Sequence, residues 1–303
     1  MSAAETTTTP ATVTLQAEGS VARRQAWSRT SRWILLAATL LGLVVLVILG
    51  IDNAIVGIPS LDWDFLSNYP SRFAERAGIR SSILGSVWVL VFTVIFAIPV
   101  AVGAAVWMEE FAPQNAILTT VRLNIANLAG VPSIIYGILG LAVFVRLMEL
   151  GPSILAGALT LALMILPMTV ITSVEAINQV APSIREGSLA LGATRWQTVW
   201  NHVLPGAMPG ILTGTILAVA RAAGETAALI MIGAFTFIAF DPALSFGGLL
   251  DSFTTLPIQV YNWTIRPQPE FRANAAAGII VLMIAVIGLN ALALVVRDRL
   301  RRN

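Results

Sequence analysis

Two opposite charges lie inside one of the most apolar stretches of the chain. Arg221 and Glu225 stand four residues apart between positions 210 and 240, and no other charged residue falls in that window. Residues four apart face each other on a helix, so we expect the guanidinium and the carboxylate to pair. A guanidinium presents a planar fork of donors that matches the oxygens of an anion such as phosphate. The pair therefore predicts an anion contact within a membrane-length segment.

Two interpretations of the pair stay open. In the first, the ion pair is structural and only makes two buried charges tolerable. In the second, Arg221 faces a polar pathway and contacts the anion, Glu225 holds the arginine when the pathway is empty, and the Thr226 hydroxyl adds a weaker contact. Inserting an arginine at mid-membrane costs about 2.5–3.5 kcal/mol, and apolar residues would stabilise a purely structural site better. We therefore predict that Arg221, Glu225 and Thr226 line a substrate pathway.

Small residues recur along the same segment. They stand every four positions, at Gly206, Gly210, Gly214, Ala218 and Ala222. Small residues at this interval allow two helix backbones to approach closely. We expect this face to pack against another helix, either within the chain or across a dimer.

A second polar feature lies between two apolar segments, at residues 186–206 (EGSLALGATRWQTVWNHVLPG). We expect a short helix over 183–191, ended by Gly192 in a left-handed conformation. Thr194 then caps a second helix, which the pair Leu204-Pro205 closes. On this helix the spacing i, i+3, i+4, i+7 predicts one apolar stripe, made by Trp196, Val199, Trp200 and Val203.

Three functions compete for this segment. An amphipathic helix on the bilayer surface would be held there by its tryptophans. A DNA-binding helix-turn-helix needs a basic face, but the loop has two arginines, no lysine and an apolar segment on each side, so we expect no nucleic-acid partner. A docking element for a soluble partner explains why two short helices and a glycine stand together on one side of the membrane, and we favour it.

Membrane helices must position both features. Of the 303 residues, 57% are hydrophobic and 11% are charged, whereas a soluble domain carries about 25% charged residues. We therefore expect an all-α integral membrane protein with six transmembrane helices. The six apolar windows are 33–51, 83–107, 123–145, 152–174, 210–240 and 275–296.

Arginine clusters at both ends indicate the orientation. Four arginines precede the first window and four follow the last, and positive flanks stay cytoplasmic, so both termini are predicted inside. The expected organisation is listed in chain order: a disordered cytoplasmic tail over 1–32, a first helix and external loop over 33–82, a membrane core over 83–296 with an inside loop over 175–209, and a cytoplasmic tail over 297–303.

Missing residue types exclude several kinds of chemistry. The chain has 18 arginines and no lysine, so it holds neither a P-loop nor a Schiff-base lysine. It has no cysteine and one histidine, His202, which excludes thiolate catalysis and argues against a histidine-based metal site. We predict a non-catalytic subunit without metal or cofactor, so that any ATP and Mg would bind to another chain.

The loop resembles the EAA loop of ABC importer permeases. The matching anchors are Glu186, Gly192, Leu204 and Pro205, at that loop's intervals. Gly187-Ser188 replaces the paired alanines of the family, and His202 replaces an isoleucine. In that family the loop is a coupling helix seated on an ATPase. The resemblance thus implies ATPase coupling by Glu186, Gly187, Ser188, Leu189, Ala190, Gly192, Ala193, Leu204 and Pro205.

Further stretches resemble the phosphate-specific, PstA-type branch of these permeases. They are 130–144, 220–229 and 256–263, within a match over about residues 80–300, and Ala228 stands where that branch has a proline. The resemblance implies the type I ABC importer permease fold in a bacterial inner membrane, with both termini inside and cytoplasmic coupling helices. It also implies that the pathway charges of this branch fall at Arg221 and Glu225.

The resemblance implies the partners as well. They are a second, PstC-like permease, a dimeric PstB-like ATPase, an extracytoplasmic PstS-like phosphate-binding protein and membrane lipid. The expected function is phosphate import into the cytoplasm. The alternatives are a permease for molybdate or sulfate, a secondary transporter with Glu225 as its only intramembrane carboxylate, and a membrane scaffold or intramembrane enzyme.

Overall fold

The computed structural model describes residues 20–235, 237–243 and 246–302 and divides into two compact units, Met1–Asp52 and Asn53–Asn303. The long helix α1, Ser20–Gly57, begins in the first unit, and the side chains of residues 31–49 are all exposed. Residues 1–19 of the expected disordered tail lie outside the described residues. The prediction is wrong for the rest of the tail, which forms the first turns of α1, because its alanines, arginines and glutamine favour helix.

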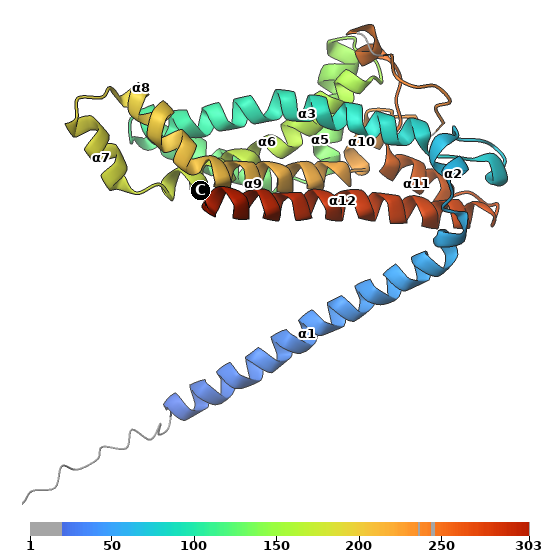
Figure 1. Ribbon diagram of the computed structural model, residues 1–303, viewed down its shortest axis with the longest axis horizontal. Coiled ribbons are helices and arrows are strands. Elements are labelled where there is room, and N and C mark those ends of the chain that lie inside the picture. The colour runs from blue at the N-terminus through green and yellow to red at the C-terminus, as the bar shows by residue number, and fades with distance from the viewer. Residues whose placement is uncertain (1–19, 236, 244–245, 303) are drawn as a thin grey trace, which may run out of the picture. The chain divides into compact units, whose positions relative to one another are not determined.

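Five helices in the described part of the chain are long and apolar enough to cross a bilayer, and the count becomes six only if one bent helix pair is a single span. Besides α1 they are α3 (Arg80–Val106, continued by the π-helical η3, Trp107–Phe111), α6 (Ile154–Asn178), the continuous helix α8–η5–α9 (Arg195–Thr198, Val199–Val203, Leu204–Ala223) and α12 (Phe271–Arg302). In the second unit, α7 (Pro182–Ala190), α8 and the C-terminus lie at one end, and α2 (Trp63–Ser67) and α11 (Leu256–Thr264) lie at the other (Figure 1).

The predicted third span, 123–145, is not one straight helix. It consists of α4 (Ala116–Ala129) and α5 (Ser133–Gly140, continued by the π-helical η4, Leu141–Leu147), and the two parts are bent by 100°. Pro132 lies at the bend, lacks the N–H that a continuous helix would use, and disfavours a helical conformation at the residue before it. Hydrophobicity predicted the length of this segment but not its bend.

The predicted fifth span, 210–240, is wrong at both ends. The helix ends at Ala223, the chain breaks at Gly224–Thr226, and a short helix α10 follows over Ala227–Met231. At the other end, Pro205 does not close the polar segment 183–205, called the docking segment from here on, because α9 continues directly from η5. A wider π-helical turn precedes Pro205; such turns are rare and occur mostly as single turns inside α-helices.

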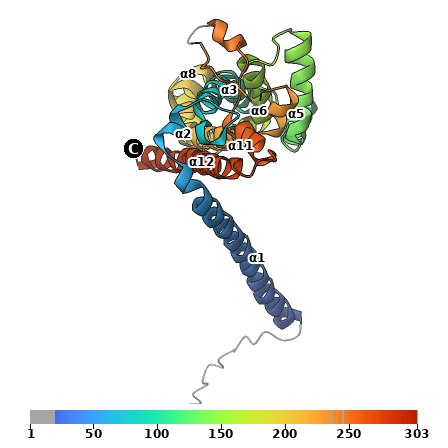
Figure 2. The same ribbon diagram turned by 90° about the vertical axis from the view of Figure 1, so that its right-hand side faces the viewer.

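Helix α6 forms the centre of the second unit. Of its membrane-length window, 67% is buried, against 28% for α3 and 6% for α12. It packs against α3, α9, α4 and α5, and Figure 2 shows this bundle from its α2 and α11 end. The first short helices, η1 (Ile58–Ser60) and η2 (Ala74–Arg76), precede α3, and η6 (Phe246–Leu250) precedes α11.

The small-residue face of α9 packs within the chain against α6. A methyl group added at Gly210 would lie 2.6 Å from the Ala176 Cβ, and one added at Gly214 would lie 2.5 Å from the Thr172 Oγ1. Ala218 and Ala222 are 5% and 2% exposed. The predicted close approach of two helices is confirmed, and its partner is α6.

Candidate functional site

The two predicted pathway charges do not form an ion pair. Arg221 lies in the last turn of α9, whereas Glu225 lies in the break after it. Because the helix ends before position 225, the one-turn spacing that predicted their contact does not apply, and none of the ion pairs in the described part of the chain joins them. The sequence-based expectation of an Arg–Glu pair on one helix face was wrong.

Glu225 instead stabilises the start of α10. Its Oε1 accepts a hydrogen bond of 3.2 Å from the backbone N–H of Ala228. The side chain also borders a small interior space together with Ser86 and Thr255. The carboxylate therefore points into the protein interior and fixes the backbone at the break between α9 and α10. A proline at position 228, as in the PstA-type pattern, would have no N–H to donate here.

Arg221 is exposed and has no hydrogen bond or ion pair among the described residues. The charge of Arg221 reaches the hydroxyl of Tyr136, which is 7% exposed in the core. The Tyr136 hydroxyl donates a hydrogen bond of 2.8 Å to the Leu128 carbonyl, so it ties α5 back to α4 across the bend. The structure thus brings Arg221 near the bent helix pair and leaves its guanidinium available for a ligand.

The short helices that follow the two breaks, α5 and α10, pack against each other. A methyl group added at Gly137 of α5 would lie 2.7 Å from the Ala228 carbonyl oxygen of α10. Next to them is a cavity of about 570 Å³, bordered by Ile134, Thr226, Ile230, Pro257, Tyr261 and others. Thr226 and Tyr261 supply its only hydroxyl groups and Arg221 is not among its lining residues, so this cavity does not suit an oxyanion.

The local structure of the docking segment follows its sequence closely. Gly192 has φ +87°, the left-handed conformation that was predicted. Thr194 caps α8: its Oγ1 accepts from the Gln197 N–H at 3.2 Å, and the Gln197 Oε1 accepts from the Thr194 N–H at 2.8 Å. The Ser188 and Thr198 hydroxyls, 2.9 Å apart, join α7 to α8.

The predicted apolar stripe of the second helix is divided between two environments. Val199 and Val203 are 2% and 1% exposed, whereas Trp196 and Trp200 are 60% and 59% exposed and stack with ring centroids 5.9 Å apart. Trp196 and Trp200 form one edge of the predicted stripe and Val199 and Val203 form the other, and only the valine edge packs against the protein interior.

The predicted coupling residues are mostly at the surface. Ser188 is buried, and Ala193 and Leu204 are partly buried. The exposed ones are Glu186, Gly187, Leu189, Ala190, Gly192 and Pro205. Beside them Leu191 is 91% exposed, the highest value among the exposed large apolar side chains of the described chain.

Sequence analysis missed two ion pairs with largely buried carboxylates near this surface. Arg185 of α7 pairs with Glu110, and Arg122 of α4 pairs with Glu109, at 2.8 and 2.9 Å. In the sequence, the two glutamates follow an apolar window directly and resemble an ordinary solvated helix end. The one hint in the sequence is that two carboxylates stand side by side at the end of an apolar window, which does not identify the arginines that bind them.

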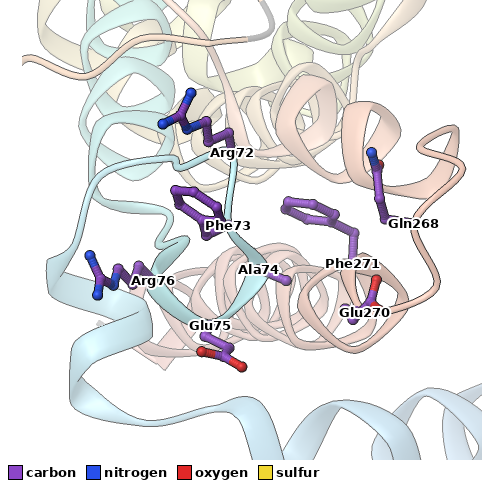
Figure 3. A pocket seen from close by; sticks show the side chains of 8 residues that line it. All are labelled: Arg72, Phe73, Ala74, Glu75, Arg76, Gln268, Glu270 and Phe271. Atoms are coloured by element: carbon purple, nitrogen blue, oxygen red, sulfur yellow. The ribbon is translucent and has the colours of Figure 1, made fainter.

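The opposite end of the unit carries a mixed pocket of about 470 Å³ (Figure 3). The rings of Phe73 and Phe271 lie across it from each other, and the Arg266 guanidinium covers the Phe271 ring at 4.3 Å. Arginines and carboxylates both border it, so it has no clear preference for an anion. The charged residues are Arg72, Glu75, Arg76 and Glu270.

The sequence matches a family and several related proteins. Residues 77–303 match the binding-protein-dependent transport system inner membrane component family. The Bacillus subtilis (strain 168) protein named "Probable ABC transporter permease protein YqgI" is 35% identical over 268 residues, which are 84% of this chain and 88% of that protein. The phosphate transport system permease protein PstA of Xylella fastidiosa is 28% identical over 246 residues, 80% of this chain and 84% of that protein.

Solved structures of ABC transporters share the fold. A chain of a bacterial alginate ABC transporter, in complex with an alginate-bound periplasmic protein, has a TM-score of 0.57 at 15% identity and covers 88% of this chain and 95% of its own length. A chain of the MetNI methionine ABC transporter, in an inward-facing conformation, has a TM-score of 0.55 at 18% identity and covers 71% of this chain and 94% of its own length. Identities this low show the fold alone.

These similarities confirm the resemblance to PstA-type permeases that the docking segment and the segment around Arg221 predicted. The relatives are membrane subunits of transporters, and the apolar helices described above are consistent with a multi-pass membrane protein. The chain belongs to the family of binding-protein-dependent transport system inner membrane components, and it is a permease subunit of an ABC importer.

Proposed function

We propose that this permease imports inorganic phosphate across the bacterial inner membrane. The observation that carries the proposal is Arg221, an exposed guanidinium without a protein partner among the described residues, at the end of an otherwise uncharged membrane helix. Such a guanidinium suits the oxygens of phosphate. The relatives named as PstA, among them those of Xylella fastidiosa and Yersinia pestis, support this choice of anion.

In this proposal the residues around the break have different roles. Arg221 contacts the anion as it passes. Glu225 acts through the backbone, because its hydrogen bond to Ala228 sets the geometry of the break. Thr226 is partly buried beside it and contributes a hydroxyl to the same turn. Because no carboxylate among the described residues occupies the guanidinium, Arg221 is free to bind the anion through its charge and its N–H donors. Water in the pathway weakens this attraction enough for release.

The docking segment seats the ATPase. Its exposed apolar residues, Leu189 and Leu191, and the exposed carboxylate of Glu186 offer a surface of the kind that a soluble partner can bury. ATP and Mg bind to that partner and not to this chain. A second permease completes the pathway, and an extracytoplasmic binding protein delivers phosphate to the end that carries α2 and α11.

Phosphate uptake tests this function. Cells that lack the gene are complemented with the wild type, with Arg221→Gln, or with Arg272→Gln as a matched control in another exposed arginine, after equal membrane levels are verified. We expect the wild type and the control to restore uptake of labelled phosphate, and Arg221→Gln to fail. Restoration by Arg221→Gln removes Arg221 from the pathway. Failure of the wild type refutes phosphate as the substrate, and labelled sulfate and molybdate then test the alternative oxyanions.

A further inference from the structure

We propose that Glu109 and Glu110 form a junction that makes the docking segment, α3 and the bent helix pair move as one body. Both glutamates lie in η3, the π-helical end of α3. Each binds an arginine from a different part of the chain: Glu110 binds Arg185 of α7, and Glu109 binds Arg122 of α4. The inference rests on the proposed docking of an ATPase at α7 but not on the identity of the substrate.

Arg185 connects three elements by itself. Its Nε donates to the Glu110 Oε1 at 2.9 Å, and its Nη2 lies 2.8 Å from the same oxygen. The Nη1 donates to the Val180 carbonyl at 2.7 Å, and the Nη2 donates to the Ile177 carbonyl at 3.0 Å. Those carbonyls are in the last turn of α6 and just after it, where a cation is favourable because helix-end carbonyls lack internal partners.

Burial of the carboxylates makes both ion pairs costly to open. The side chains of Glu109 and Glu110 are each 9% exposed, whereas that of Arg185 is 22% exposed and that of Arg122 is 37% exposed, so the Arg185–Glu110 pair is the better shielded of the two. Removing one partner of a buried pair leaves an uncompensated charge away from water. The elements can therefore separate only if a carboxylate is left unpaired, so motion of α7 carries η3 and the start of α4 with it.

Apolar contacts beside the junction also hold these helices together. Ala105 of α3 shares a buried cluster with Ile177, Val180 and Val203. Met108, which precedes the two glutamates, shares another with Leu118 of α4 and Val170 of α6. Close-packed interiors transmit displacement rather than absorb it. The ion pairs thus add to apolar packing that already holds α3, α4 and α6 together.

The junction has a consequence for the pathway. The docking segment is continuous with α9, which carries Arg221, so one movement reaches the guanidinium directly. Through Glu109 and Arg122 the same movement reaches α4 and α5, where Gly137 packs against Ala228. Both sides of the helix breaks are then displaced together, and we assign Glu109, Glu110, Arg122 and Arg185 as positioning residues for transport.

Spin-label distances in the assembled permease–ATPase complex test the rigid-body claim without any substrate. The chain has no cysteine, so labels attach only where cysteines are introduced, at Ile184 of α7 and Ile117 of α4, which are 44% and 73% exposed. Only labelled complexes that still hydrolyse ATP are measured. We expect the same distance distribution with and without bound ATP, and a broadened or shifted one in Arg185→Gln. A shift with ATP in the otherwise unchanged chain overturns the proposal, and so does an Arg185→Gln variant that behaves like it.

A double-mutant cycle measured on transport shows whether Arg185 and Glu110 position the helices or only stabilise the fold. Arg185→Gln, Glu110→Gln and the double variant are compared for phosphate imported per ATP hydrolysed, with exposed Arg299→Gln at the same end as control. We expect each single variant to lower this ratio by about tenfold or more, with the double variant no worse than either one. Equal loss of hydrolysis and uptake, or simple multiplication of the two effects, overturns the proposal. If the wild-type complex imports no phosphate, the proposed substrate fails, and the spin-label result still decides the junction.

Discussion

The contact between α6 and α9 at Gly210 allows a quantitative prediction. An alanine at position 210 would place its Cβ 2.6 Å from the Ala176 Cβ, whereas carbon atoms in contact prefer about 3.5–4.0 Å. The Ala176 methyl group cannot rotate away, so the two helices must separate by roughly 1 Å. Overpacking of this kind costs about 1–3 kcal/mol, and we expect Gly210→Ala to destabilise the protein within that range.

A second substitution isolates the contact from other effects. Ala176→Gly removes the opposing methyl group, so the double variant Ala176→Gly/Gly210→Ala moves one Cβ from α6 to α9 without a clash. Changes in helix propensity, about 1 kcal/mol for each exchange, cancel in the cycle because they occur once in a single variant and once in the double variant. The predicted coupling free energy is therefore at least the overpacking term, about 1–3 kcal/mol in favour of the double variant, because the alanine at 210 also fills the space that Ala176→Gly leaves empty.

The free energies come from unfolding of the purified permease in mixed detergent micelles, followed by tryptophan fluorescence. Gly103→Ala in α3 is the matched control, since a methyl group there meets no neighbour within 4 Å, and it should leave stability equal or slightly higher. Strictly additive effects of Ala176→Gly and Gly210→Ala would refute the claim that these two positions fix the distance between α6 and α9.

Three further outcomes follow from single contacts. Glu225→Gln keeps an oxygen for the Ala228 N–H and should retain most phosphate uptake, whereas Glu225→Ala should lose it; a large loss in Glu225→Gln would show that the charge itself is needed. Gly192→Ala forces a side chain into φ +87°, which costs about 1–2 kcal/mol, and should weaken co-purification of the ATPase, while Gly103→Ala of α3, whose added methyl group meets no neighbour within 4 Å and which lies outside the predicted coupling residues, serves as its control. Tyr136→Phe removes the bond to the Leu128 carbonyl and should lower unfolding stability by about 0.5–1.5 kcal/mol, with no change contradicting the role of that bond at the bend.

Local features of the docking segment were predictable because they depend on near neighbours in the chain. The left-handed Gly192 and the Thr194 cap require only the residues beside them, and both appear as predicted. The spacing of small residues in α9 depends on one helix alone and correctly indicated a close helix contact. Hydrophobicity likewise indicated the membrane-length helices α1, α3, α6 and α12, but not the breaks within the third and fifth windows.

Tertiary structure decided where the helices break and which charges meet. Apolar windows carry no mark at Gly224 or Pro132 that separates a kink from a complete break, because neighbouring helices decide whether the freed backbone groups find partners. Once α9 ends at Ala223, Glu225 turns to the Ala228 N–H and Arg221 is left without a carboxylate. The pairs of Glu109 and Glu110 join residues far apart in sequence, and only packing of α4 and α7 around η3 brings their arginines within reach.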